Sequence, residues 1–324
     1  MTLSVVLFTA GLIIIYYGAE FLVSGASALA RSLGMSPMVI GLTVVAFGTS
    51  APETFVSVVS SLKGKSMLAV GNVIGSNICN IALVLGLSAV FLPIPAQTSV
   101  VRRDIPIMLG ISLYLLVISY NSVIGRIEGI TLIIGIFSYT FLNYYIARRE
   151  LKKLTGKVSF AKPLTSPKKW GSRLKQIGLV IVGIAGVVAG AELIIDSAVK
   201  IMSILGVSEK FIGLTIVAFG TSLPELATSV VAAWKKEMDI SLGNLVGSNV
   251  FNILSVLGIA SLIRPIVIPG GFIQSGLIYD YLMMIFISFL PWLMMRTSYK
   301  ISRFHGLFLL SCYGAYLAWL IINA

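Results

Sequence analysis

Long apolar runs, separated by short polar stretches, extend through the whole chain. Each run holds roughly 20 residues, the length that a helix needs to cross a hydrocarbon layer of ~30 Å. Strands of a membrane barrel would be shorter and would alternate apolar with polar residues, so these runs predict helices. We therefore expect an all-α membrane protein with ten transmembrane helices, near residues 3–30, 36–61, 66–91, 105–120, 124–147, 176–203, 209–234, 240–263, 274–295 and 304–322.

The amino-acid composition supports a membrane location. Apolar residues make up 57% of the chain and charged residues 11%, and the mean hydropathy is +0.99. These values exclude an ordinary water-soluble domain. The first apolar run is too long for the core of a signal peptide and follows no Lys or Arg, so we expect it to be retained as a helix.

The positive charge of the chain predicts its topology. A net charge of +12 would suggest nucleic acid as a partner of a soluble protein, but in a membrane protein the positions of Lys and Arg set the orientation. Segment 148–175 is strongly basic. If it is cytoplasmic and ten helices alternate, most of the 24 Lys and Arg residues are cytoplasmic too. We expect a multi-pass cell-membrane protein with both termini outside, membrane lipid around it and no nucleic-acid partner.

Two phrases of the sequence occur twice with one spacing. "GLTVVAFGTSAPE" at 41–53 returns as "GLTIVAFGTSLPE" at 213–225, an offset of 172. The same offset relates "GNVIGSNICNIALVLGL" at 71–87 to "GNLVGSNVFNILSVLGI" at 243–259. The chain therefore contains a duplicated unit.

Each copy of the unit holds five of the expected helices. Because five is odd, the second copy must enter the membrane from the opposite face, which gives two inverted repeats. Many secondary transporters use this plan, since it lets one central site open to either side in turn. The expected organisation is a first five-helix repeat at 1–147, a basic linker at 148–175 and a second five-helix repeat at 176–324.

A proline interrupts the first of the two repeated phrases. Pro52 has no N–H for the carbonyl of Gly48, and its ring crowds that carbonyl. We expect the helix to kink or break around Ala46–Thr49, and Pro224 predicts the same in the second copy. Carbonyls freed within the hydrocarbon layer need new partners.

The two phrases supply oxygen-bearing side chains at equivalent positions in both copies. These are Glu53, Thr49, Ser50, Ser76 and Asn80 in the first copy, and Glu225, Thr221, Ser222, Ser248 and Asn252 in the second. An all-oxygen set suits calcium, sodium or magnesium rather than zinc or copper. An ionisable group at mid-membrane costs ~2.5 kcal/mol or more, and here the cost is incurred twice. We expect a cation site and no resident cofactor.

Four of the other acidic residues in the apolar runs can be interpreted from the repeat. Glu20 and Glu192 are also related by the repeat, but they lie late in a long helix, so we expect interfacial or salt-bridging roles. Asp196 and Asp280 have no acidic counterpart in the other copy. We expect both of these to be structural.

The paired "GTSAPE" and "GTSLPE" phrases, each followed by a "GSNxxN" phrase, resemble the alpha-repeats of the cation/calcium exchanger superfamily. The resemblance is strongest to prokaryotic sodium/calcium exchangers and covers essentially the whole chain. It implies ten helices in two inverted halves, and alternating access by sliding of the first and sixth helices. It also implies an antiporter, not an enzyme, that exchanges sodium, three ions in this family, for one calcium and moves net charge.

The resemblance also assigns ligands. Calcium would be held by the side chains of Glu53 and Glu225 with the carbonyls of Thr49 and Thr221. Some relatives carry aspartate where this chain has Asn252, so the central site has one ionisable group fewer. We expect exchange without potassium.

Sodium would bind on either side of calcium. Toward one side, the implied ligands are the carbonyl of Ala46 with Thr49, Ser76 and Glu53. Toward the other side, they are the carbonyl of Ala218 with Thr221, Ser248 and Glu225.

Three other functions remain open. A proton-coupled calcium exchanger of the same superfamily typically replaces the "GTSxPE" phrase with one built on Gly-Asn and Glu, which is absent here. An intramembrane enzyme could use Glu53 and Glu225 as general acid and base, but the phrases offer no nucleophile with an activating base. A passive channel is the third alternative. We expect the chain to work as a monomer, with calcium and sodium as its partners.

Overall fold

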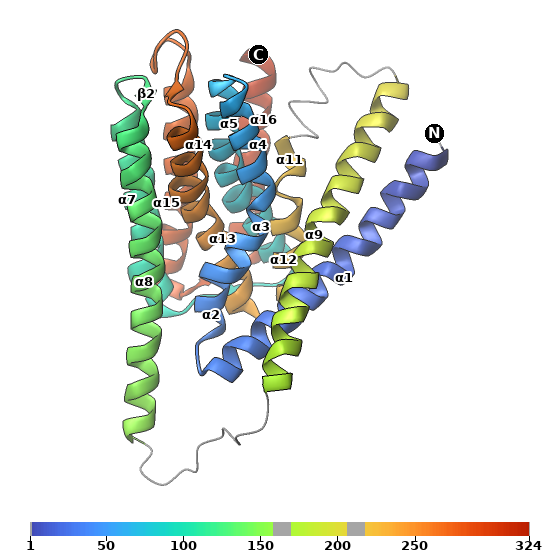
Figure 1. Cartoon of the computed structure of the whole chain (residues 1–324), viewed down its shortest axis with the longest axis vertical. Helices are drawn as coiled ribbons and strands as arrows, with labels where there is room; N and C mark the ends of the chain where they lie inside the picture. The colour runs from blue at the N-terminus through green and yellow to red at the C-terminus, as the bar shows by residue number, and fades with distance from the viewer. Residues whose placement is uncertain (1, 158–169, 206–217, 324) are drawn as a thin grey trace.

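The computed structural model describes residues 2–157, 170–205 and 218–323, and these residues are predominantly helical (Figure 1). Seven helical segments are long and apolar enough to cross a membrane. They are α1 (Thr2–Leu33), α5–η2–α6 (Ser66–Phe91), α8 (Arg126–Lys157), α9 (Trp170–Ile204), α13–η5–α14 (Met238–Ile263), α15 (Leu277–Ser298) and α16 (Arg303–Asn323).

An eighth span consists of helical pieces. A bend of 46° separates Pro37–Thr49 from Ala51–Leu62. The expected break at Ala46–Thr49 lies one residue later, at Ser50, because Pro52 is the second residue of the following helix, where a missing N–H breaks no hydrogen bond. The pieces are α2 (Pro37–Ile40), the π-helix η1 (Gly41–Val45), α3 (Ala46–Thr49) and α4 (Ala51–Leu62).

Two more of the expected spans correspond to shorter helices. Helix α7 (Ile105–Ser119) continues from the π-helix η3 (Val100–Asp104), which carries three charged residues. In the second copy, α11 (Ala218–Gly220) and α12 (Leu223–Trp234) flank a turn. The first residues of the expected span at 209–234 lie outside the described residues. Part of the linker at 148–175 lies outside them too.

Helices α1 and α9 form an antiparallel pair that leans away from the other helices (Figure 1). Small residues allow the two backbones to meet. A Cβ on Gly18 would lie 2.6 Å from the amide nitrogen of Val187, and a Cβ on Gly183 would lie 2.4 Å from that of Leu22. Larger side chains at either glycine would therefore separate α1 from α9.

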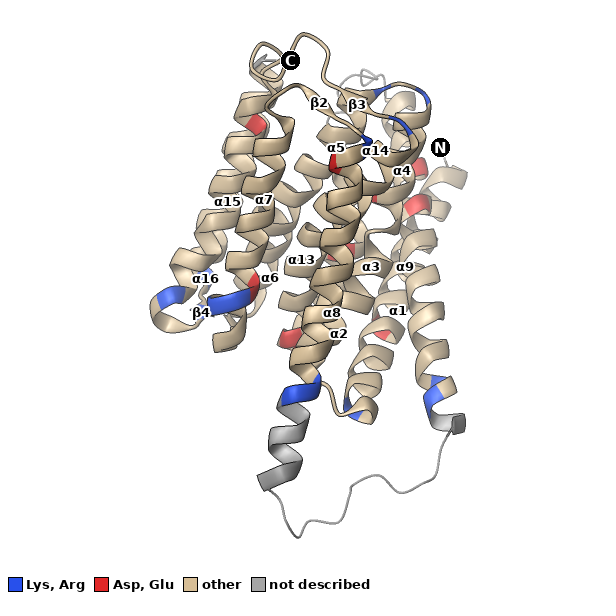
Figure 2. Cartoon of the chain, turned by 60° about the vertical axis from the view of Figure 1, so that its left-hand side comes forward, with Lys and Arg blue, Asp and Glu red and all other residues tan. Residues whose placement is uncertain are grey.

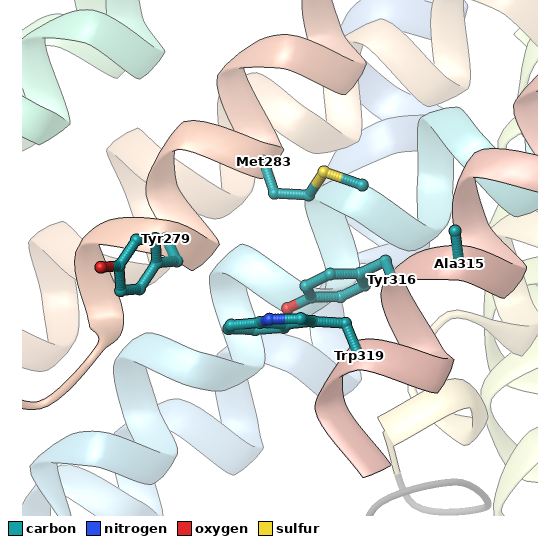
Figure 3. Close-up of a pocket in the computed structure, with 5 residues that line it drawn as sticks. All are labelled: Tyr279, Met283, Ala315, Tyr316 and Trp319. Atoms are coloured by element: carbon teal, nitrogen blue, oxygen red, sulfur yellow. The ribbon is translucent and has the colours of Figure 1, made fainter. Parts of the chain in front are cut away.

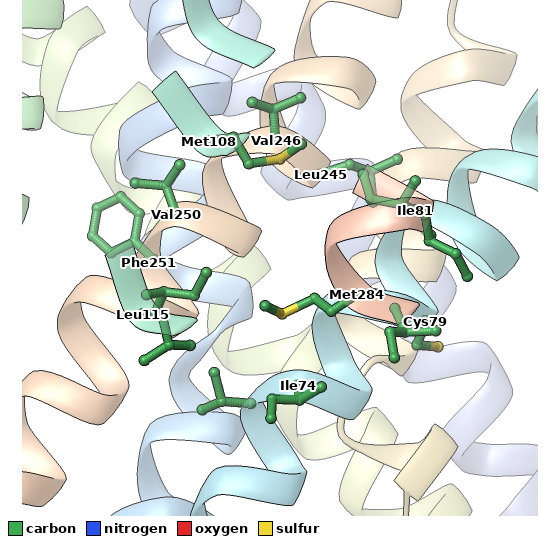
Figure 4. Packing of buried hydrophobic residues seen from close by; sticks show 14 of the residues in the cluster. Ile74, Cys79, Ile81, Met108, Leu115, Leu245, Val246, Val250, Phe251 and Met284 are labelled. Atoms are coloured by element: carbon green, nitrogen blue, oxygen red, sulfur yellow. The ribbon is translucent and has the colours of Figure 1, made fainter. Parts of the chain in front are cut away.

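The two helices that carry the "GSNxxN" phrases form the centre of the protein. The most apolar window of Ser66–Phe91 and that of Met238–Ile263 are each 78% buried, compared with 28% for α1. Each of these helices widens to a π-helix, and their apolar side chains pack together with Met108, Leu115 and Met284 from neighbouring helices (Figure 4). The pieces are α5 (Ser66–Ile78), η2 (Cys79–Leu85), α6 (Gly86–Phe91), α13 (Met238–Phe251), η5 (Asn252–Leu257) and α14 (Gly258–Ile263).

Two short antiparallel pairs of strands connect the ends of the helices. Strand β1 (Ile94–Pro95) pairs with β4 (Lys300–Ile301), and β2 (Val123–Ile124) pairs with β3 (Ile266–Val267). Lys and Arg lie mainly near helix ends, whereas the middle of the structure is almost free of them (Figure 2). This distribution is the one that a membrane requires.

Candidate cation-binding site

The two broken helices bring Glu53 and Glu225 into the interior. Each glutamate is the third residue of a helix that begins with a proline at its second position, α4 and α12 respectively. Both side chains are 0% exposed, and they lie within electrostatic reach of each other. The positive end of each helix dipole favours a negative charge at this position.

The carboxylate oxygens have few protein donors. Ser50 donates a hydrogen bond of 3.2 Å from Oγ to Oε1 of Glu225. Among the described residues, Oε2 of Glu225 and both carboxylate oxygens of Glu53 have no hydrogen-bond partner. Buried carboxylate oxygens are costly to leave unpaired, so this cluster is suited to a bound cation.

Thr49 links the first broken helix to α13. Its Oγ1 donates to Oδ1 of Asn244 at 3.0 Å and lies 3.3 Å from Oγ of Ser248. Asn244 in turn donates to Ser229 at 3.2 Å. Thr49 and Ser248, both expected site residues, therefore belong to one buried network beside Glu225.

The equivalent residues of the other half are not joined. Thr221 and Ser76 correspond to Thr49 and Ser248, yet neither hydroxyl has a hydrogen-bond partner among the described residues. Asn72, the equivalent of Asn244, donates to Ser57 at 2.9 Å, as Asn244 does to Ser229, but it also donates to the carbonyl of Glu53 at 3.2 Å and makes no bond to Thr221. Identical sequence phrases thus have different contacts in the two halves.

Four buried asparagines form a hydrogen-bonded cluster that includes the expected site residues Asn80 and Asn252. Asn80 donates from Nδ2 to Oδ1 of Asn249 at 3.1 Å, and Asn252 donates to Oδ1 of Asn77 at 3.1 Å. Asn77 and Asn249 also exchange hydrogen bonds with each other's backbone carbonyls, at 3.3 and 3.2 Å. These bonds engage the amide NH₂ groups and leave Oδ1 of Asn80 and of Asn252 without a partner.

The sequence analysis singled out Asn80 and Asn252 but missed Asn77 and Asn249. The repeat itself was the available signal, because both residues belong to the identical "GSN" triplets. Asn72 and Asn244 were missed too, although the "GN" pairs that open the same phrases carry them.

The two backbone carbonyls expected to bind sodium, those of Ala46 and Ala218, differ in their surroundings. The carbonyl of Ala46 accepts a hydrogen bond of 3.0 Å from the amide of Ser50 and one of 3.4 Å from Oγ1 of Thr49. In the second copy, the amide of Ser222 bonds to the carbonyl of Phe219 at 3.1 Å, one residue after Ala218.

The site as a whole offers unpaired oxygens rather than nitrogen or sulfur ligands. Among the residues that the structure describes, no three or more His, Cys, Asp or Glu side chains gather as they would at a transition-metal centre. Carboxylate, hydroxyl and amide oxygens are the donors that hard cations prefer. At the expected site residues, the buried oxygens without a partner in the described part of the chain are Oε1 and Oε2 of Glu53, Oε2 of Glu225, Oγ of Ser76 and Ser222, Oγ1 of Thr221, and Oδ1 of Asn80 and Asn252.

Comparisons with known proteins point the same way. The protein family described as "Sodium/calcium exchanger protein" matches residues 3–145 and 175–322. The inner membrane protein YrbG of Escherichia coli is 36% identical over 321 residues, 99% of this chain and 96% of YrbG. The sodium/calcium exchanger MaX1 of Methanosarcina acetivorans is 30% identical over 348 residues, 98% of each chain.

A solved structure extends the similarity to three dimensions. The sodium-calcium exchanger NCX_Mj, soaked with sodium and without calcium, superposes with a TM-score of 0.84 at 35% sequence identity, covering 98% of each chain. Other structures of that exchanger were obtained after soaking with calcium or strontium.

Proposed function

Because the chain belongs to the sodium/calcium exchanger protein family and is a membrane transporter, not an enzyme, we propose that it exchanges sodium for calcium across the membrane. The observation that carries this proposal is the pair of fully buried carboxylates, Glu53 and Glu225, whose oxygens are largely unpaired among the described residues. Two carboxylates can neutralise one divalent ion in surroundings of low dielectric constant.

Competition for one site makes the process an exchange. If calcium and sodium both need Glu53 and Glu225, occupancy by one excludes the other. The empty site carries a charge near −2, calcium neutralises it, and three sodium ions leave it near +1. Transport at this ratio moves net charge, so it senses the membrane potential.

The proposed ligands of calcium and of sodium are oxygens of the residues in the two repeated phrases. Calcium binds Glu53 and Glu225 with the carbonyls of Thr49 and Thr221. Sodium binds on one side to Ala46, Thr49, Ser76 and Glu53, and on the other to Ala218, Thr221, Ser248 and Glu225, while Ser50, Ser222, Asn80 and Asn252 complete the oxygen-rich surroundings. The unpaired oxygens of Ser76 and Thr221 support this assignment. The hydrogen bonds that Thr49 makes must rearrange when sodium binds on its side.

The architecture proposed for this function is ten helices in two inverted five-helix repeats, 1–147 and 176–324, joined by the basic linker 148–175. The antiparallel packing of α1 on α9, which are equivalent helices of the two copies, supports an inverted relation. The linker is cytoplasmic and both termini lie outside. The transporter works as a monomer and alternates access between the two faces.

Transport requires no potassium, because Asn80 and Asn252 bring no additional carboxylate to the site. The alternative coupling ion is the proton. Both questions are answered by calcium uptake into proteoliposomes of purified protein. We expect uptake when sodium is inside and absent outside, in potassium-free buffer. Uptake driven by a pH gradient with no sodium present would support the proton exchanger, and uptake with no counter-ion would support a channel.

A further inference from the structure

A cavity of about 300 Å³ lies beside the site, next to the turn between α11 and α12. Its lining includes Thr221 and Asn72, together with Gly71 and Gly75 of α5 and residues of α15 and α16. Thr221 is 5% exposed and lines this cavity, and its buried hydroxyl has no hydrogen-bond partner among the described residues. A space of this size accommodates roughly ten water molecules.

In the other half of the repeat, a hydrogen bond joins the two residues that are equivalent to Thr221 and Asn72. Thr49 and Asn244, the equivalents of Thr221 and Asn72, form a hydrogen bond of 3.0 Å. On the other side of the site, the cavity lies where that bond would be, and both Thr221 and Asn72 line it. The cavity therefore reaches Thr221, one of the residues assigned to the cation site.

Among the residues that the structure describes, Asp280 is the one charged residue that lines this cavity. It lies in the first turn of α15, and its Oδ1 accepts a hydrogen bond of 2.9 Å from the hydroxyl of Tyr316 on α16. Tyr316 is 7% exposed and stacks on Trp319, with ring centroids 6.3 Å apart. Figure 3 shows the two rings one above the other in a neighbouring pocket. The carboxylate is thus held in place rather than mobile.

We propose that Asp280 attracts hydrated cations into this cavity and so supplies the exchange site from the membrane face opposite the basic linker. This inference rests on the proposed function and adds a residue that the repeat does not supply, since Met108 occupies the equivalent position. Residues near the C-terminal end of α16 line the cavity, and that end lies opposite the C-terminal end of α8, at which the linker begins (Figure 1). Most of the other residues that line the cavity are apolar, and walls of low dielectric constant focus the field of a single carboxylate, which raises the local concentration of cations.

The attraction of cations by Asp280 should be stronger for divalent calcium than for monovalent sodium. The local concentration varies exponentially with charge, so a potential that concentrates sodium about threefold concentrates calcium about ninefold. Salt weakens the effect because the Debye length shrinks to about 3 Å at 1 M ionic strength. A ligand of the exchange site itself would instead alter turnover and would respond little to added salt.

The test measures exchange by Asp280→Asn in membrane vesicles of both orientations. The asparagine can still accept the Tyr316 hydrogen bond, so the fold is retained. At low ionic strength we expect the KM for calcium to rise about ninefold and the inhibition constant for sodium about threefold, at the cavity face only. The maximal rate should stay as in wild type. Added choline chloride should remove the difference.

Two controls keep the inference falsifiable. Asp239→Asn removes a carboxylate that accepts a hydrogen bond of 2.6 Å from Gln97 and does not line the cavity, so its KM at the cavity face should match wild type. Tyr316→Phe keeps the charge and should retain most of the calcium affinity. An unchanged KM in Asp280→Asn, or equal changes at both faces, would overturn the inference. Absence of exchange by wild type would instead contradict the proposed function.

A second inference comes from ion pairs at the other face. Lys235, which follows α12, lies 3.0 Å from Glu20 of α1, as expected for a salt-bridging Glu20, and also donates to Ser24 at 2.8 Å. Two residues further on, Glu237 pairs with Arg31 at 3.2 Å and accepts a hydrogen bond from Ser27. These contacts tie the end of α1 to the turn between α12 and α13.

The repeat places complementary charges at the equivalent positions. The offset of 172 carries Glu20 onto Glu192 of α9, and Lys235 onto Lys63 at the turn between α4 and α5. All four residues lie at least partly exposed. No ion pair joins Glu192 to Lys63 within the described part of the chain, although both are described. In this conformation the Glu20–Lys235 pair is therefore formed, and the equivalent Glu192–Lys63 pair is not.

We infer that the two pairs alternate, with Glu20–Lys235 holding the present conformation and Glu192–Lys63 holding the conformation that opens to the opposite face. This inference also rests on the proposed function. The α4–α5 turn, which carries Lys63, lies at the top of Figure 1, whereas the C-terminal end of α1, near which the Glu20–Lys235 pair holds the turn between α12 and α13, lies at the bottom. Each pair is partly exposed, so its loss should shift the balance only about two- to fivefold.

Opposite shifts test this alternation. Glu20→Gln should raise the KM for calcium at the cavity face and lower it at the linker face, whereas Glu192→Gln should do the reverse. The exchange Glu20→Lys with Lys235→Glu should restore the wild-type values. Lys236→Gln, beside Lys235 but with no ion pair in the described structure, serves as control. Shifts in one direction for both glutamates, or none for either, would overturn the inference.

Discussion

The hydroxyl of Ser50 donates a hydrogen bond of 3.2 Å to the carboxylate of Glu225. Ser50 belongs to the first copy of the repeated phrase and Glu225 to the second, so one carboxylate is held by the break in the opposite half. The two halves therefore build a single site, and no half is complete alone.

Glu53→Gln and Glu225→Gln should each lower calcium uptake by about a hundredfold or more, because a desolvated divalent ion then faces only one carboxylate. The variants should fold, since glutamine is nearly isosteric and the amide oxygen at 225 can still accept from Ser50. The measurement is sodium-driven calcium uptake, with size-exclusion elution as the check on folding. Glu128→Gln is the matched control, because Glu128 accepts only a backbone hydrogen bond at the start of α8. Substantial uptake by either site variant would refute the assignment.

Asn249→Ala should destabilise the protein by about 1–3 kcal/mol, because it leaves the amide donor of Asn80 without its acceptor and the carbonyl of Asn77 without the donor that bonds to it. A freed NH₂ group of Asn80 beside the cation should also weaken calcium binding. Thermal unfolding in detergent and the KM for calcium would be measured on the same preparation. Wild-type stability together with wild-type KM would show that the asparagine network does not support the site.

The absence of a third carboxylate predicts potassium independence. Wild type should exchange at full rate in potassium-free vesicles. Asn252→Asp should perform worse, because its carboxylate replaces the amide donor that faces Oδ1 of Asn77 at 3.1 Å and repels that oxygen. Exchange by both proteins would be followed with and without potassium. An absolute potassium requirement in wild type would contradict the charge argument.

The charge of the loaded carrier predicts a response to voltage. With three sodium ions exchanged for one calcium, each cycle moves one positive charge, worth about 2.3 kcal/mol per 100 mV. Calcium uptake driven by outward sodium movement should therefore change when a valinomycin-clamped potential is reversed. A rate that is indifferent to the clamp would indicate a neutral ratio.

Much of the candidate site was predictable from the sequence. Pro52 and Pro224 located the breaks to within a residue or two, because proline is tolerated in the first turn of a helix but not in its interior, so a helix has to begin just before it. The recurrence of Glu53 and Glu225 in an apolar chain identified the carboxylates. The shape of the bend was not predictable, since the π-helix at Gly41–Val45 depends on packing against α13.

The asymmetry between the halves was beyond the reach of the sequence. Thr49 and Thr221 occupy the same phrase, yet one is hydrogen-bonded to Asn244 and the other lines a cavity. A duplicated sequence describes both halves equally, and only the conformation distinguishes them. Asp280 was interpreted as structural, because it has no acidic counterpart in the other copy. Its place beside the cavity depends on how α15 and α16 lie against α5, which could not be predicted from the sequence.

The central claim is that calcium and sodium compete for the oxygens around Glu53 and Glu225. Equilibrium calcium binding to the purified protein, measured across a series of sodium concentrations, tests it most directly. The apparent Kd for calcium should rise steeply and without limit as sodium increases, while the number of calcium sites stays constant, and Glu53→Gln should bind little calcium at any sodium concentration. Saturation by both ions at once, with a calcium Kd that levels off at high sodium, would contradict the shared site.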